Sequence, residues 1–92
     1  MSDDALAELL TLTVEVDWWG ATVYRNHLGQ IHRVHGPAVI WPYGSKDWYL
    51  DGKRHRTDGP AIVWPNGALS RWYLDDEHLT EQEFNERIKS LR

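Results

Sequence analysis

The chain has 92 residues, enough for a single domain (residues 1–92) and too few for a second. Its hydrophobic share of 41% and charged share of 26% are those of an ordinary soluble domain. No apolar run of about eighteen residues is present to span a membrane, and no secretory signal is recognisable at the N-terminus. The absence of cysteine excludes disulfides, thiolate catalysis and cysteine-based zinc sites.

The charge is distributed unevenly along the sequence. Residues 1–17 hold five acids and no base, residues 18–73 hold seven Lys or Arg against three Asp, and residues 74–92 hold six acids and three bases. A basic, aromatic middle therefore lies between two acidic ends. The net charge of −4 argues against indiscriminate nucleic-acid binding, because that binding needs a basic face; the middle alone still supplies enough bases for one.

The N-terminal segment, residues 1–21, predicts a short helix followed by a strand. Residues 5–10 favour a helix that Ser2 or Asp3 would cap. Residues 11–18 alternate strictly between apolar and polar side chains, which is typical of a strand.

An internal repeat organises residues 22–79. Three segments recur 23 or 24 residues later: His32–Ala38 as His55–Ala61, Trp41–Gly44 as Trp64–Gly67, and Trp48–Asp51 as Trp72–Asp75. The segment from Tyr24 to Arg33 has the features of the tail of an earlier, degenerate copy. The chain therefore holds about two and a half copies.

Each copy of the repeat predicts β-hairpins. The β-branched and aromatic runs at residues 38–41 and 61–64 are typical of strands, and each precedes a glycine turn and a second strand, at residues 47–50 and 70–74. Short connections imply antiparallel neighbours. The expected fold is mainly β, within the α+β class: an antiparallel meander of stacked β-hairpin repeats. Because both faces of these strands are apolar, the second face is expected to be covered.

Residues 80–91 predict a C-terminal helix that caps the array. Thr80 and Glu83 form a capping-box pattern, and Leu79 and Phe84 form a hydrophobic staple around it. The apolar face expected for this helix consists of Phe84, Ile88 and Leu91. That face is suited to covering a sheet face or an open edge.

The run Trp48–Ala61 resembles a short tandem repeat found in proteins of tailed bacteriophages and giant viruses. That repeat has the form W-Y-x-[ND]-G-x-x-H-R-x-D-G-P-A and a loose kinship to MORN-type β-hairpin repeats. Leu79–Asn85 is similar to the L-[ST]-E-E-E-F-N segment that closes many such chains. The resemblance covers roughly residues 22–86 and implies a phage origin and a setting in the host cytoplasm. It brings no established activity, catalytic residue, cofactor or ligand.

Three positions depart from the repeat. His35 stands where the repeat has Asp, Asp76 stands in place of the turn glycine, and Leu79 occupies the position aligned with His55. The first departure puts any shared role of that position in doubt for the first copy. The other two mark where the array ends.

The histidines suggest a metal site that other features of the sequence disfavour. His32 and His35 are three residues apart, His55 and Asp58 repeat the spacing, and two His with a carboxylate can hold a divalent metal. On a strand this spacing places the side chains on opposite faces, and the neighbouring arginines repel a cation. We therefore expect His32 and His55 to bind turn backbone, and Asp58 to pair with Arg56 or cap its turn. We predict no metal, cofactor or catalytic residue.

The aromatic residues are the strongest functional candidates, because six Trp are too many for so small a core. Four are expected to be mostly structural: Trp41, Trp48, Trp64 and Trp72. Arg and exposed aromatics together are typical of protein–protein hot spots. The predicted partner-binding residues are Trp18, Trp19 and Tyr43, the bases Arg33, Arg54, Arg56 and Arg71, and the helix acids Glu81, Glu83 and Glu86.

These features favour a small, phage-encoded, non-enzymatic binding protein that engages and inhibits a bacterial host protein. Host takeover or an anti-defence role, such as that of an anti-CRISPR inhibitor, is the expected setting. The acids of the helix and of residues 75–77 have the charge to imitate phosphate, although complementation of the helix dipole explains them as well. No membrane partner is expected.

Two alternatives stay open. One is a single-stranded nucleic-acid-binding module, in which Trp rings stack on bases and five cations contact the backbone: Arg33, Lys53, Arg54, Arg56 and Arg71. The other is a self-associating structural protein, including a symmetric homodimer.

Overall fold

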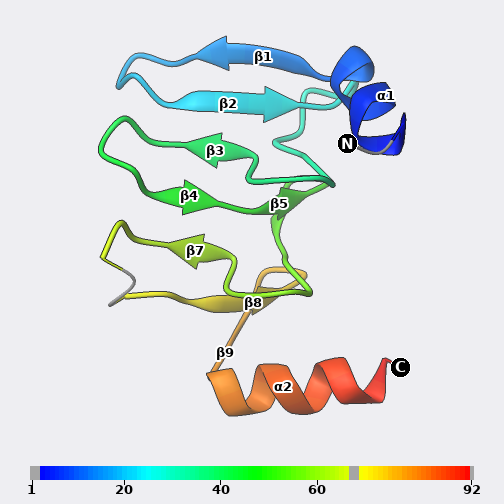
Figure 1. The fold of residues 1–92 in the computed structure, drawn as a ribbon, viewed down its shortest axis with the longest axis vertical. Coiled ribbons are helices and arrows are strands. Elements are labelled where there is room, and N and C mark those ends of the chain that lie inside the picture. Colours follow the sequence, from blue (N-terminus) through cyan, green and yellow to red (C-terminus); the bar gives the residue numbers. More distant parts are fainter. Residues whose placement is uncertain (1–2, 67–68, 92) are drawn as a thin grey trace.

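The computed structural model describes residues 3–66 and 69–91. Its elements are, in chain order, α1 (Asp3–Thr11), β1 (Thr13–Val16), β2 (Thr22–Arg25), β3 (Val39–Ile40), β4 (Lys46–Asp47), β5 (Tyr49–Leu50), β6 (Lys53–Arg54), β7 (Ile62–Val63), β8 (Trp72–Leu74), β9 (Glu77–Leu79) and α2 (Glu81–Ser90). Figure 1 shows the strands stacked one above another, with α1 beside the first hairpin and α2 below the last.

The strands form one main sheet and two separate hairpins. Five antiparallel strands pair in the order β1-β2-β3-β4-β7, while β5 pairs with β6 and β8 pairs with β9. In the first full copy, for example, β3 and β4 are neighbours in the main sheet, and the chain then forms the separate β5–β6 hairpin (Figure 1). The predicted antiparallel meander is confirmed.

The two full copies share one pattern of backbone hydrogen bonds. Equivalent N–H groups donate to equivalent carbonyls: His32 to Tyr24 and His55 to Trp48, Arg33 to Tyr49 and Arg56 to Tyr73, Ala38 to Asp47 and Ala61 to Arg71. The sequence repeat is therefore a structural repeat, in which each copy contacts its neighbours along the stack.

The turns between the short hairpin strands depend on left-handed backbone. Asp51 and Gly52 have φ values of 50° and 84°, and Asp75 and Asp76 have 46° and 70°. Aspartate tolerates this region better than most residues, which explains why Asp76 can replace the usual glycine. Its Oδ1 also accepts the backbone N–H of Arg54 at 2.8 Å, a bond that glycine cannot make.

Two small apolar clusters form the core. The first is Ala21, Val23 and Val39, with Ile31, Trp41 and Tyr49 packed against it; the second is Leu74, Leu79 and Phe84, with Trp72 and Ile88. The second cluster joins α2 to the β8–β9 hairpin. Helix α2 therefore covers the end of the array. In the main sheet Ile40, Ile62 and Val63 are only half-buried.

Helix α2 begins as predicted. Thr80 is the N-cap, its Oγ1 accepts the backbone N–H of Glu83, and the Glu83 side chain accepts the N–H of Thr80 in return. The staple residues Leu79 and Phe84 are both buried. The prediction that Leu91 belongs to the apolar face of this helix is wrong: the helix ends at Ser90, and the Leu91 side chain is 71% exposed.

The N-terminal elements differ in extent from the prediction. Strand β1 covers only four of the residues at 11–18, and all four are exposed because β1 is the end strand of the sheet. Asp3 is the first residue of α1, while Ser2, the other predicted cap, lies outside the described residues, as does Gly67 of the second predicted turn. No helix in the described part of the chain is long and apolar enough to cross a membrane.

Candidate functional site

Arg33 and Arg56 are held in the same way in the two copies. The guanidinium carbon of Arg33 lies 4.2 Å from the ring centroid of Tyr24, and that of Arg56 lies 3.8 Å from the ring of Trp48. In both copies Nη1 donates to the carbonyl of the proline four residues later, at 3.3 Å and 3.0 Å. We call each set an arginine bracket. Each bracket ties one motif loop to an aromatic ring of the preceding hairpin.

The glycine of the motif leaves room for the bracket. A Cβ atom on Gly36 would lie 3.0 Å from the guanidinium carbon of Arg33, and one on Gly59 would lie 2.9 Å from that of Arg56. Any side chain here would displace the guanidinium from its ring. The repeated Arg, Gly and Pro are thus explained by packing within the fold.

The motif histidines connect successive copies. The Nδ1 atom of His32 accepts the backbone N–H of Asp51 at 2.9 Å, and Nδ1 of His55 accepts that of Asp75 at 3.1 Å. The expectation that these histidines bind turn backbone is confirmed. Within residues 3–66 and 69–91, no three His, Asp or Glu side chains gather in a way that suits a metal ion.

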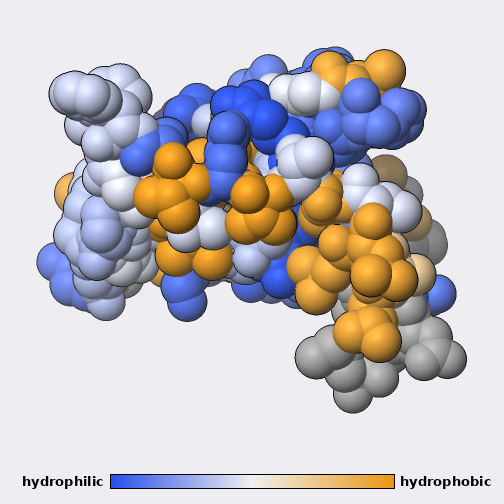
Figure 2. All heavy atoms as spheres, turned by 90° about the horizontal axis from the view of Figure 1, so that it is seen from above, coloured by the Kyte–Doolittle hydropathy of each residue, from blue (hydrophilic) through white to orange (hydrophobic). Residues whose placement is uncertain are grey.

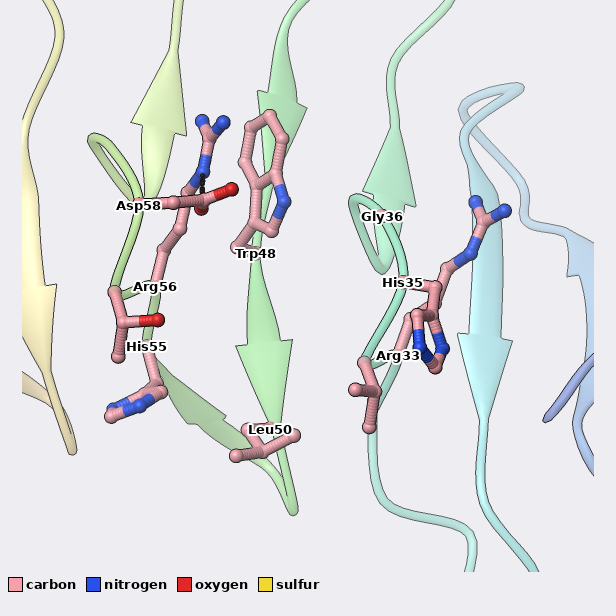
Figure 3. Close-up of a pocket in the computed structure, with 10 residues that line it drawn as sticks. Arg33, His35, Gly36, Trp48, Leu50, His55, Arg56 and Asp58 are labelled. Atoms are coloured by element: carbon pink, nitrogen blue, oxygen red, sulfur yellow. Dashed lines mark hydrogen bonds and ion pairs between the residues drawn. The ribbon is translucent and has the colours of Figure 1, made fainter. Parts of the chain in front are cut away.

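In the second copy an aspartate completes the bracket. Asp58 Oδ1 accepts from Nε of Arg56 at 2.8 Å, as Figure 3 shows beside Trp48. This hydrogen bond holds the pKa of the Asp58 carboxyl below its ordinary value. The predicted pairing of Asp58 with Arg56 is confirmed.

In the first copy His35 takes that position, Nε of Arg33 has no partner among the described residues, and Glu8 of α1 binds the loop backbone. The carboxylate of Glu8 accepts the backbone N–H groups of Val34 and His35, the latter at 3.0 Å. Burial raises the pKa of the Glu8 carboxyl, but the two backbone hydrogen bonds and the His35 side chain together outweigh burial, so the pKa lies below its ordinary value. An Asp at position 35 would place a second negative charge beside Glu8, which gives a physical reason for the histidine.

A groove of about 690 Å³ separates the two motif loops. Figure 3 shows Arg33 and His35 on one side of it and Arg56, Asp58 and Trp48 on the other. The planar faces of both guanidinium groups are already covered by rings of this chain. The groove therefore offers few of the contacts that the sequence predicted for its arginines.

The turn tips on the opposite side of the stack carry exposed aromatics. Trp18, Trp19 and Tyr43 are 90%, 71% and 58% exposed, as predicted. Neighbouring tips lie close together: a Cβ atom placed on Gly20 of the first tip would lie 3.4 Å from the Pro42 side chain of the next.

Tyr43 and two neighbouring rings form a row. The centroids of Trp41 and Tyr43 are 5.9 Å apart, those of Tyr43 and Trp64 are 6.2 Å apart, and the planes lie within 27°. Trp64 was expected to be structural, but it ends the row and is 36% exposed. We call these rings together the aromatic ridge: Trp18, Trp19, Trp41, Tyr43 and Trp64.

A slot of about 220 Å³ lies in the row; its lining includes Trp41, Tyr43, Trp64, Ser45, Asp47 and Arg54. Ser45 is 2% exposed, and its Oγ has no hydrogen-bond partner among the described residues. Burial raises the pKa of the Asp47 carboxyl, and its Oδ2 accepts from the Trp41 indole at 3.3 Å.

Sequence reasoning missed this slot, although a signal for it was present. In an antiparallel hairpin, Ser45 pairs opposite Trp41 and Asp47 opposite Val39, so all four side chains share one face. The pairing of these residues becomes visible only when the strand register is known, which the sequence alone does not give.

The other predicted residues lie apart from the ridge. Arg54 is half-buried, with its guanidinium 5.5 Å from the rings of both Tyr49 and Tyr73, whereas Arg71 is exposed. The acids of α2 are exposed on the capping helix, but Glu83 serves its N-cap and Glu86 accepts from Gln82. These three acids lie within residues 81–86, on the helix below the stack and away from the ridge (Figure 1).

Comparison with protein-family models, with curated proteins and with solved structures gave no match to this chain.

Proposed function

We propose that this protein is a small, non-enzymatic binding module that engages and inhibits a host protein through its aromatic ridge. The observation that carries the proposal is the exposure of Trp18 and Trp19, at 90% and 71%, on one turn tip. Trp side chains bury a large apolar area when covered, and they are enriched among the residues that dominate binding energy. Adjacent tips extend this surface along the stack.

The phage origin, the host-cytoplasm setting and the anti-defence role are proposed from the resemblance of the repeat. A compact module that covers a functional surface of its target needs no catalytic group to inhibit it. An anti-CRISPR-like inhibitor or another host-takeover factor fits this description. The bracketed arginines support the choice of a protein target, because Arg33 and Arg56 already lie on rings of this chain and not on a free surface.

Affinity capture from host lysate tests the proposal. Tagged wild-type protein is compared with the double variant Trp18→Ser/Trp19→Ser and with Leu10→Ser, a control at an exposed apolar residue of α1. We expect one partner in fixed stoichiometry with wild type and control, and its loss with the double variant. Capture of the same partner by the double variant would overturn the assignment of the ridge.

A second candidate function, self-association, is favoured by strand β1. This strand ends the main sheet, and its Val14 and Val16 are 53% and 70% exposed. Figure 2 shows apolar side chains gathered on this upper face of the molecule. Open edge strands are templates for pairing with another chain. Light scattering over a concentration series tests this candidate, and a monomer at every concentration would remove it.

A further inference from the structure

The second arginine bracket shows how this fold holds a guanidinium group. Arg56 lies 3.8 Å from the Trp48 centroid, and its Nε donates to the Asp58 carboxylate at 2.8 Å. An aromatic face and a carboxylate together satisfy the planar cation. The bracket is therefore a template against which other aromatic–carboxylate pairs in the molecule can be compared.

The slot in the aromatic ridge holds the same kinds of group, but within residues 3–66 and 69–91 its carboxylate is not joined to a guanidinium. Its lining includes the rings of Trp41, Tyr43 and Trp64, the Asp47 carboxylate and Arg54. Among the described residues, Asp47 takes part in none of the ion pairs. The slot thus offers an aromatic surface and a carboxylate without a cation bound between them.

The slot has unused hydrogen-bond acceptors on Asp47 and Ser45, and one buried donor, Nε of Arg54, without a partner among the described residues. Asp47 accepts one bond of 3.3 Å from Trp41, which leaves most of its lone pairs free. Ser45 is 2% exposed, and its Oγ is unpartnered within residues 3–66 and 69–91. A buried acceptor without a partner costs free energy, so a donor that enters the slot removes that cost. Burial also raises the pKa of Asp47, and a cation beside it would lower it again.

We propose that the slot receives an arginine side chain of the target protein, which lies against the Tyr43 and Trp64 rings and donates to Asp47. This inference rests on the proposed function and specifies the chemistry of its partner. A guanidinium is planar, as the ring faces require, and it carries several donors for the acceptors of the slot. A nucleobase also stacks on such rings, but the carboxylate of the slot repels the phosphates that would come with it.

Arg54 is a cation of this chain that also lines the slot, but among the described residues it forms no ion pair with Asp47. The guanidinium of Arg54 lies 5.5 Å from the rings of both Tyr49 and Tyr73. Its charge lowers the pKa of Asp47 in part, but burial remains the larger effect. Arg54 therefore reduces the attraction for an incoming cation without occupying its place.

A titration of the purified protein tests the inference without any target protein. The probe is the capped peptide Gly-Arg-Gly, and its matched control is the same peptide with citrulline, the neutral isostere of arginine. The readout is the NMR resonance of the Trp41 indole N–H, which donates to Asp47, with the Trp48 indole as internal reference. We expect a saturable shift of Trp41 with the arginine peptide and affinity about tenfold weaker with citrulline, because a charged hydrogen bond is lost.

Two variants separate this site from the bracket. Asp47→Asn keeps the shape of the slot and is expected to lower the affinity for the arginine peptide about tenfold. The matched control is Asp58→Asn, at an aspartate of the second bracket near Trp48. This variant is expected to leave the affinity for the arginine peptide unchanged. Equal binding of the two peptides, or undiminished binding by Asp47→Asn, would overturn the inference. So would a shift of Trp41 by oligothymidine in place of the peptide.

The two proposals fail in different ways. If Asp47→Asn captures the host partner as well as wild type does while Trp18→Ser/Trp19→Ser does not, the binding function stands and the arginine slot is refuted. If neither wild type nor any variant captures a partner, the binding function is refuted whatever the peptide does.

Discussion

At the scale of single residues, most of the repeated positions serve the contact between copies. The arginine lies on a ring of the preceding hairpin, the glycine makes room for it, and the histidine accepts a bond from the following turn. From the sequence, His32 and His55 were expected to bind turn backbone, as they do. Arg33 and Arg56 were predicted to contact a partner and instead lie on rings of this chain. The rings that the arginines contact were not predictable, because the Trp48 ring meets Arg56 only through the register of the intervening hairpin.

The second bracket predicts a stability cost for a conservative change. Arg56→Lys keeps the charge but loses the planar stacking on Trp48 and the geometry of the Nε bond to Asp58. We expect destabilisation by about 2 kcal/mol in urea unfolding. Arg71→Lys, at an exposed arginine, is the matched control and should change stability by less than about 0.5 kcal/mol. Equal midpoints for the two variants would contradict the bracket.

The docking of α1 predicts a local pH dependence. The folded-state pKa of Glu8 lies below the ordinary value of 4.5, so its contribution to stability is complete above that pH. It is lost as the pH falls through the folded pKa. The amide resonances of Val34 and His35, which donate to Glu8, should therefore titrate below pH 4.5. Glu8→Gln should abolish this titration, and a midpoint above 4.5 would show that the carboxylate is not held by these amides.

At the scale of elements, the helices were more predictable than the strands. The cap and staple of α2 are local patterns, so the sequence places its start at the residue after Thr80. The strands are only two to four residues long, because turns and Gly-Pro pairs interrupt them. Alternation at residues 11–18 predicted a longer strand than β1. The alternating apolar residues indicated burial of one face, but all four residues of β1 are exposed.

The α2 cap predicts a measurable loss of stability. Thr80→Ala removes the side chain that accepts the Glu83 N–H, and it should destabilise the protein by about 1 kcal/mol. The control is Thr57→Ala, at an exposed threonine of the second motif loop, which should have little effect. Thermal unfolding followed by circular dichroism compares the two variants. An unchanged Thr80→Ala protein would mean that α2 contributes little to the folded state.

At the scale of the whole molecule, the stack has a small core and a large exposed surface. It exposes 6244 Å², compared with about 5,500 Å² for a typical compact protein of its mass. Only small clusters are buried, so contacts between copies carry much of the stability. The same geometry lines up the turn tips on one side (Figure 1), and it brings Trp41, Tyr43 and Trp64 of successive tips into one stacked row.

The proposed role of the ridge is tested most directly by hydroxyl-radical footprinting of the protein alone and in complex with its captured partner. Binding through the ridge predicts strong protection of Trp18, Trp19 and Tyr43 in the complex, with Trp72 of the α2 end as an unchanged reference. Protection confined to α2, or to the groove beside His35, with the turn tips still oxidised as in the free protein, would contradict it.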